Sequence, residues 1–86
     1  MPVAYVLINT EVGAEREVLE KLREIPEVVE AYIVFGIYDV IAKVSVDRQE
    51  LLGEVVTNKL RRLEKVRHTL TIIAVEGFER CQPSCT

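Results

Sequence analysis

A short turn signal near the middle of the chain constrains the fold more than any other feature. Residues 35–39, with the sequence FGIYD, separate two apolar runs at residues 28–34 and 40–46. Both runs are rich in β-branched residues and are too short to form ordinary helices. Gly36 can adopt a positive φ without a Cβ penalty, which suits a tight turn. The pattern therefore predicts two antiparallel strands joined as a hairpin.

Before this hairpin the sequence predicts a strand and an amphipathic helix. Residues Val3–Ile8 form an apolar run that ends in the polar stretch NTEVG, which suits a turn and a helix start. From Ala14 the apolar residues recur at helical spacing, and charged residues fill the remaining positions. Because Pro26 cannot extend a helix, we expect this helix to end near Glu24.

After the hairpin the sequence predicts a second helix and a last strand. Asp47 and Glu50 stand at the spacing of a capping box, which marks a helix start. One face of this helix carries Leu51, Leu52, Val55, Val56, Leu60 and Leu63. Residues His68–Gly77 alternate as a strand does, with Leu70, Ile72 and Ala74 on one side and Thr69, Thr71, Ile73 and Val75 on the other.

The order strand, helix, strand, strand, helix, strand indicates an α+β domain of the ferredoxin-like class, βαββαβ. Such a domain has a four-stranded antiparallel sheet with both helices on one face. The 86 residues suffice for one domain only, and a domain of this size buries about 60 to 65% of its unfolded surface. We expect the domain to span residues 1–78 and a polar tail to span residues 79–86.

Every predicted strand carries apolar residues on both faces. In the first strand Val3, Tyr5 and Leu7 alternate with Ala4, Val6 and Ile8. Two helices cover only one face of the sheet, and monomers rarely expose apolar patches larger than a few hundred Å². We therefore expect the second face to pack against another copy in a homodimer, with a monomer that exposes part of its sheet as the alternative.

The charge balance argues against direct nucleic-acid binding. Eleven Lys and Arg residues are interleaved with fourteen Asp and Glu residues, and the formal net charge is −3. A nucleic-acid-binding surface gathers its basic residues on one face instead. No apolar run approaches the roughly 18 residues that span a bilayer, and the N-terminus lacks a basic leader, so we expect no membrane association and a cytoplasmic protein.

A group of basic residues follows the second predicted helix, and it has two interpretations. The group consists of Lys59, Arg61, Arg62, Lys65 and Arg67. The simpler interpretation is a solvated surface, because like charges often serve solubility alone. The alternative is a basic cluster that contacts a partner.

The sequence contains no pattern that indicates an enzyme, and we expect no cofactor. His68 is the only histidine, and a lone histidine at a strand end is more often structural than catalytic. No Gly-rich phosphate loop is present. A small dimeric α+β enzyme is the alternative, because similar folds host such enzymes. A pocket that joins His68 and Tyr38 across a dimer would favour it.

The tail contains the two cysteines of the chain, Cys81 and Cys85. They suit an inert solvated tail, a disulfide within or between subunits, or two ligands of a shared metal site. A metal site is the weaker interpretation, because two thiolates fall short of the usual four zinc ligands.

Several segments together resemble the effector-binding (RAM) domain of the Lrp/AsnC family of transcriptional regulators. They are the Gly-x-Tyr-Asp hairpin at residues 36–39, the pair Thr69 and Thr71, and the segments at residues 25–31 and 60–63. The resemblance covers about residues 3–78. Full-length members of the family carry an N-terminal helix-turn-helix domain, whereas Met1 here stands almost directly before the first strand. The chain thus resembles a stand-alone version of the domain, without its own DNA-binding domain.

The resemblance implies an amino acid effector, a non-enzymatic role in transcriptional regulation, and self-assembly. Dimers would form through the open sheet face as a dimeric α+β barrel and associate into octamers or decamers, with the effector between neighbouring dimers. Full-length Lrp/AsnC regulators are implied as further partners. The residues that match the family's ligand-binding positions are Gly36, Tyr38, Asp39, Thr69 and Thr71.

These residue types suit a free amino acid, which presents a carboxylate and an ammonium group. Backbone amides near Gly36 can approach the carboxylate, Asp39 can pair with the ammonium, and the hydroxyls of Thr69 and Thr71 can bridge to either. Tyr38 would wall the pocket. The alternative is that these are ordinary turn and strand residues, and that the domain serves assembly alone.

Overall fold

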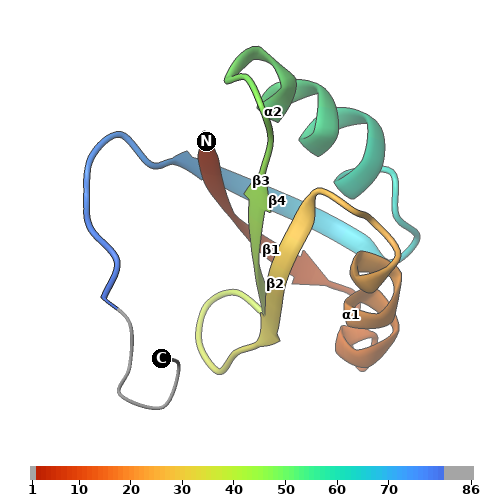
Figure 1. Cartoon of the computed structure of the whole chain (residues 1–86). Coiled ribbons are helices and arrows are strands. Elements are labelled where there is room, and N and C mark those ends of the chain that lie inside the picture. Colours follow the sequence, from red (N-terminus) through yellow and green to blue (C-terminus); the bar gives the residue numbers. More distant parts are fainter. Residues whose placement is uncertain (1, 81–86) are drawn as a thin grey trace.

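The computed structural model describes residues 2–80 and confirms the predicted order of strands and helices (Figure 1). The strands are β1 (Val3–Thr10), β2 (Val28–Ile33), β3 (Val40–Ser45) and β4 (Val66–Ile73). The helices are α1 (Glu15–Arg23) and α2 (Glu50–Val55), which continues as a π-helical turn, η1 (Val56–Leu60). The strands form one antiparallel sheet in the order β2-β3-β1-β4, which is the ferredoxin-like arrangement.

Both helices lie on one face of this sheet, as predicted (Figure 1). The pairings Val6 with Ala42 and Ile8 with Val40 place side chains of β1 and β3 on the covered face. All four of these residues are fully buried. The same core contains Ala4, Val18, Leu22, Ile25, Val44, Val46, Leu52, Val55, Val56 and Leu60. No helix of residues 2–80 covers the opposite face of the sheet (Figure 1).

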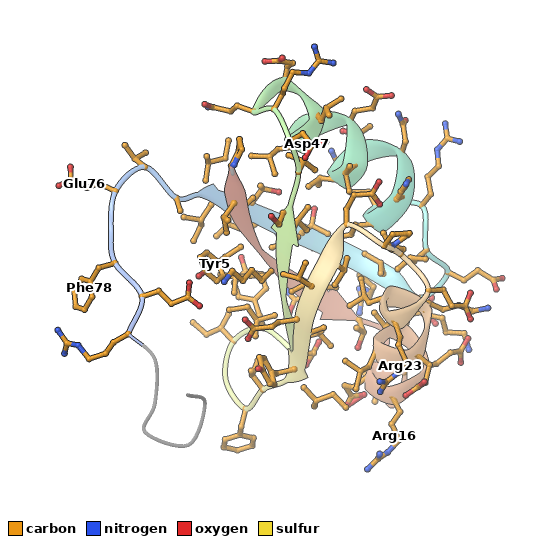
Figure 2. All side chains as sticks on the ribbon, in the orientation of Figure 1. Tyr5, Arg16, Arg23, Asp47, Glu76 and Phe78 are labelled. Carbon is orange, nitrogen blue, oxygen red and sulfur yellow. The ribbon has the colours of Figure 1, made fainter. Side chains whose placement is uncertain are left out.

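The first helix, α1, is amphipathic as predicted. Val18 and Leu22 point into the core, and the charged residues lie outside. Acidic residues occupy its first turn and basic residues its last turn, which complements the helix dipole. Figure 2 shows the side chain of Arg16 extending away from the sheet.

The second helix starts without the predicted capping box. Its N-cap residue is Gln49, and no side chain caps it, so the prediction for Asp47 and Glu50 is wrong. The reason is that Gln49 already has helical dihedrals and Leu51 donates to the Arg48 carbonyl. The chain therefore enters the helix through a backbone turn that begins after Asp47.

The π-helical turn η1 ends the second helix on the side of β4. The amide of Arg61 donates to the carbonyl of Val56 at 2.9 Å, which is the spacing of a π-helix. Within η1, Lys59 Nζ donates to both carboxylate oxygens of Glu27, at 2.9 and 3.0 Å. This hydrogen bond holds the pKa of Glu27 below its ordinary range. The ion pair ties η1 to the segment before β2.

The hairpin pairs β2 with β3 as predicted, and the amide of Val34 donates to the carbonyl of Asp39 at 2.9 Å across its base. Gly36 does not adopt the positive φ that a tight turn would require. The glycine with a positive φ is Gly13, at 80°, in the turn before α1. The connection at residues 34–39 is longer than a two-residue turn, so it closes without a left-handed residue.

The last strand ends at Ile73, although the alternation predicted a strand up to Gly77. The amide of Ala74 makes the last bond to β1, with the carbonyl of Val3. Because β1 begins at Val3, no strand remains for residues beyond Ala74 to pair with. Residues 74–80 leave the sheet on the side opposite the helices (Figure 1). The proposed boundary between residues 78 and 79 stays a prediction.

Candidate functional site

Asp39 is held at the base of the hairpin by backbone hydrogen bonds. Its amide donates to the carbonyl of Ile8, and its Oδ2 accepts from the amide of Thr10, both at 2.9 Å. β1 reaches Thr10, beyond the predicted end at Ile8, because Asn9 and Thr10 pair with His68 and Val66 of β4. Within residues 2–80 the other carboxylate oxygen, Oδ1, makes no hydrogen bond. Asp39 thus has a structural role and one oxygen available for a ligand.

Tyr38 packs against His68 within one protomer. The two rings are nearly parallel, at 21°, and their centroids are 6.3 Å apart. This spacing lies within the range of favourable aromatic pairs. His68 pairs with Asn9 across the sheet, so it lies on the face away from the helices. In the part of the chain that the structure describes, neither side chain is hydrogen-bonded to a group that would orient it for proton transfer.

The tip of the hairpin stands in solvent. Phe35 and Ile37 are 108% and 89% exposed, and Gly36 lies between them. A Cβ on Gly36 would meet nothing within 4 Å in this chain. Large apolar side chains in this position have no internal packing role, which is typical of a contact with a ligand or another chain.

Thr69 and Thr71 lie on the face of the sheet that the helices cover. They pair with Ile8 and Val6 of β1, whose side chains point toward the helices. There they line a groove of about 270 Å³ between β4 and the second helix, which we call the β4 groove. The other lining residues are Leu52, Gly53, Val56, Thr57, Arg61 and Ile73.

The predicted site residues therefore form two separate groups in one chain. Gly36, Tyr38 and Asp39 belong to the hairpin, and the two threonines belong to the β4 groove. β1 lies between the hairpin strands and β4, which separates Val40 from Thr69 by two strand spacings, about 10 Å. The two threonines also lie on the face that the helices cover, whereas Tyr38 packs against His68 on the opposite face. One protomer does not bring the two groups together.

Reasoning from the sequence missed the helical wall of this groove. Gly53, Thr57 and Arg61 follow one another at intervals of one helical turn, and all three line the groove. The spacing was visible in the sequence, because residues at i and i+4 share a helix face. What the sequence could not reveal is that β4 runs beside this face with Thr69 and Thr71.

The uncovered face of the sheet is apolar at its centre and polar at one corner. Leu70 and Ile72 of β4 pair with Leu7 and Tyr5 of β1 on this face, and both β4 side chains are exposed. At the corner, the Tyr32 hydroxyl donates to Glu30 at 2.7 Å, which raises the pKa of Tyr32. This pattern of apolar centre and polar rim is typical of a protein interface.

The segment after β4 is separated from this uncovered face by an open space. A space of about 760 Å³ separates residues 73–79 from side chains of the sheet that include Tyr5, Glu30 and Lys43. Figure 2 shows Tyr5 on the side of the sheet that faces this segment, with Phe78 on the segment's outer side. Phe78 is exposed, and the guanidinium of Arg80 lies 5.1 Å from the centroid of its ring.

Two further features bear on possible functions. In residues 2–80 no group of three or more His, Cys, Asp and Glu side chains is placed to hold a metal ion. Cys81 and Cys85 lie outside the described residues, so their disulfide and metal interpretations stay predictions. No helix in residues 2–80 is both long and apolar enough to cross a membrane.

The sequence itself decides the family. The sequence model of the family described as Lrp/AsnC ligand binding domain matches residues 3–82, nearly the whole chain. This chain belongs to the Lrp/AsnC ligand-binding domain family. An HTH-type transcriptional regulator from Pyrococcus furiosus is 35% identical over 74 residues, which are 83% of this chain and 49% of that protein. The chain thus spans about half the length of the curated relatives it matches.

Solved structures agree in fold. The crystal structure of FFRP-DM1 is 45% identical with a TM-score of 0.83, and the match covers 87% of this chain and all of that one. TTHA0845 from Thermus thermophilus is 36% identical with a TM-score of 0.85, over 93% of this chain and 100% of that one. E. coli AsnC is 25% identical with a TM-score of 0.87, over 94% of this chain and 56% of AsnC. The Lrp/AsnC ligand-binding domain therefore shares its ferredoxin-like fold with small chains and with longer regulators.

Proposed function

We propose that this Lrp/AsnC domain binds an amino acid effector in a site completed between copies of the chain, and that it acts in transcriptional regulation. The observation that carries the proposal is the separation of the two groups of site residues. The hairpin tip and the β4 groove are both exposed, and they lie on different sides of one protomer. The hairpin of one copy inserting beside the β4 groove of a neighbour would unite them.

Each group supplies part of what an amino acid requires. Asp39 offers Oδ1 to the ammonium group while Oδ2 stays bonded to Thr10. Gly36 lets the neighbouring backbone approach the ligand closely, because no Cβ stands in the way. Thr69 and Thr71 supply hydroxyls from the neighbouring copy. Tyr38 walls the site and is itself supported by His68.

The proposal includes a homodimer that forms through the uncovered face of the sheet. That face exposes Tyr5, Leu70 and Ile72 to solvent in a single copy. A second copy would cover these side chains by a two-fold interface, in which the same surface serves both partners. Dimers would then associate into octamers or decamers, in which the hairpin of one dimer meets the β4 groove of the next.

The proposed partner is a full-length Lrp/AsnC regulator that supplies DNA binding, with no direct nucleic-acid contact by this chain. The curated relatives are named HTH-type regulators and are about twice as long as the matched segment. FFRP-DM1, by contrast, is matched over its whole length, so this fold also occurs in chains of about this size. The cytoplasm is the proposed compartment. The relatives' names also support a regulator in preference to an enzyme.

Isothermal titration of the intact protein against each standard amino acid tests this proposal. The panel includes L-Met, because a Neisseria meningitidis regulator of the same fold, 15% identical, was crystallised as an L-Met complex. We expect at least one amino acid to bind, and Asp39→Asn to weaken that binding about tenfold or more through loss of the charged pair. Asp47→Asn, which removes an acid outside both groups, is the matched control.

Two results would contradict the proposal. Absence of heat for every amino acid, with an intact oligomer, would favour a domain that serves assembly alone. Equal affinity of wild type and Asp39→Asn would remove the hairpin from the site.

A further inference from the structure

We propose that the β4 groove is a carboxylate-binding site in which Arg61 pairs with the carboxylate of the ligand. This inference rests on the proposed function and deepens it, because it names the chemical group that the β4 half of the site binds. It assigns the carboxylate to Arg61 instead of the backbone amides near Gly36.

Arg61 is the cation of this groove. It lines the groove together with Thr69 and Thr71, and it also lines an adjoining hollow with Arg67 and His68. The ion pairs among residues 2–80 include neither Arg61 nor Arg67. A guanidinium binds a carboxylate through two parallel hydrogen bonds, so an uncommitted arginine beside hydroxyl groups suits this ligand class.

The π-helical turn places Arg61 in this position. Its amide bonds to the carbonyl of Val56, so the chain makes one wide turn before it leaves the helix. Thr57 and Arg61 both line the groove, opposite Thr69 and Thr71 on the strand. Hydroxyl donors thus come from both walls. Single π-helical turns are frequent at functional sites, because the extra residue redirects side chains.

Gly53 supports the presence of a ligand on independent grounds. It lies inside α2, where glycine is about 0.5 to 1 kcal/mol less favourable than alanine. A Cβ at this position would meet nothing within 4 Å, so internal packing does not require glycine. Gly53 leaves the helical wall of the groove bare, which lets a ligand approach the backbone.

The groove also has an apolar part, which defines the rest of the ligand. Leu52 and Val56 are buried residues of the helical wall, and Ile73 lies at the far end of the strand wall. A small acid with a branched aliphatic group matches both parts. Its carboxylate would face Arg61 and the threonines, and its aliphatic group would cover Leu52 and Ile73.

Isovalerate is the probe that tests this groove alone. It carries a carboxylate and a branched aliphatic group but no ammonium, so it does not depend on Asp39. Isovaleramide is its neutral analogue of nearly the same shape. We titrate the intact protein with each compound and follow the backbone amides of Thr57, Thr69 and Thr71 by heteronuclear NMR. We expect isovalerate to shift these amides and to bind at least about tenfold more tightly than isovaleramide.

Arg61→Gln is expected to abolish the preference for the acid, and Arg61→Lys is expected to retain part of it, because lysine keeps the charge but not the two parallel bonds. Arg62→Gln removes the same charge from the adjacent residue, which does not line the groove, and is expected to retain the full preference. An unchanged NMR fingerprint elsewhere confirms that each variant folds.

The proposal is overturned if acid and amide shift the groove amides equally or not at all, or if Arg62→Gln loses the preference as Arg61→Gln does. These outcomes are distinct from failure of the proposed function. A groove that binds isovalerate in a protein that binds no amino acid would support the carboxylate site and contradict the effector assignment.

Discussion

At the scale of residues, Asp39 has two tasks that different substitutions separate. Oδ2 accepts a hydrogen bond from the amide of Thr10, which is partly buried at the end of β1. Asparagine can still accept this bond through its amide oxygen but carries no charge, whereas alanine leaves the Thr10 amide without its partner. The structural role and the proposed ligand role of Asp39 are therefore separable.

We expect Asp39→Ala to lower the free energy of unfolding by roughly 1 to 3 kcal/mol, the cost of an unsatisfied donor and a lost charged acceptor. Asp39→Asn is expected to lose less than half as much. Chemical denaturation of both variants measures the difference. Equal losses would mean that the Thr10 bond contributes nothing specific.

The ion pair between Glu27 and Lys59 makes a pH-dependent prediction. Lys59 lowers the pKa of Glu27 in the folded protein, so the pair stabilises the fold above the ordinary pKa of glutamate, about 4.3. That contribution is lost as the pH falls through the lowered pKa of the folded state. Because both side chains are partly exposed, we expect Glu27→Gln to cost up to about 1 kcal/mol at neutral pH.

The measurement is the free energy of unfolding of wild type and Glu27→Gln at pH 7 and in the acid range. The difference should shrink below about pH 4.3 and vanish once Glu27 is protonated in the folded state. Glu24→Gln, an exposed acid outside the ion pairs found in residues 2–80, is the control. A difference that persists in acid would assign the effect to packing.

At the scale of elements, two glycines predict opposite effects of the same substitution. Gly53→Ala should raise the free energy of unfolding by about 0.5 to 1 kcal/mol, because alanine favours the helix and its Cβ has open space. Gly13→Ala should lower it by about 1 kcal/mol or more, because Gly13 has a φ of 80°. Thermal and chemical denaturation of the two variants provide the test. A loss for Gly53→Ala would reveal a contact that the folded chain alone does not contain.

Prediction from the sequence succeeded most for the order and type of the helices and strands. Strand and helix types follow from local periodicity, such as the alternation of Ala4, Val6 and Ile8 with residues of the other face. The end of β4 did not follow, because it depends on where β1 begins, which is a pairing between distant segments. The capping of α2 failed for a local reason, since a backbone turn replaced the side chain of Asp47.

The sequence indicates individual candidate site residues, but it does not indicate how they are arranged in space. Asp39 and Thr69 stand out in the sequence, yet strand order alone determines that β1 separates them. The sequence suggests a solvated surface or a partner contact for Arg61 and no role for Thr57, because nothing local indicates that β4 runs beside them or that the helix ends in a π-helical turn.

At the scale of the whole molecule, the uncovered sheet face predicts that assembly can be broken without unfolding the chain. Leu70 is 44% exposed on this face, so Leu70→Glu should leave the protomer folded while it places charges in the dimer interface. We expect light scattering to give a monomer mass for Leu70→Glu and a larger mass for wild type. Val12→Glu is the control, because Val12 is 100% exposed in the turn before α1. An unchanged mass for Leu70→Glu would place the interface elsewhere.

The most direct test of the central claim, that hairpin and groove meet between copies, is to mix two variants that each bind weakly. Asp39→Asn impairs the hairpin, and a double variant with Thr69→Val and Thr71→Val impairs the groove. Each alone should have no site of wild-type affinity, but after refolding together about a quarter of the shared sites should pair an intact hairpin with an intact groove. Titration should therefore recover about a quarter of the wild-type sites. No recovery, with mixed oligomers verified by mass, would mean that each chain builds its site alone.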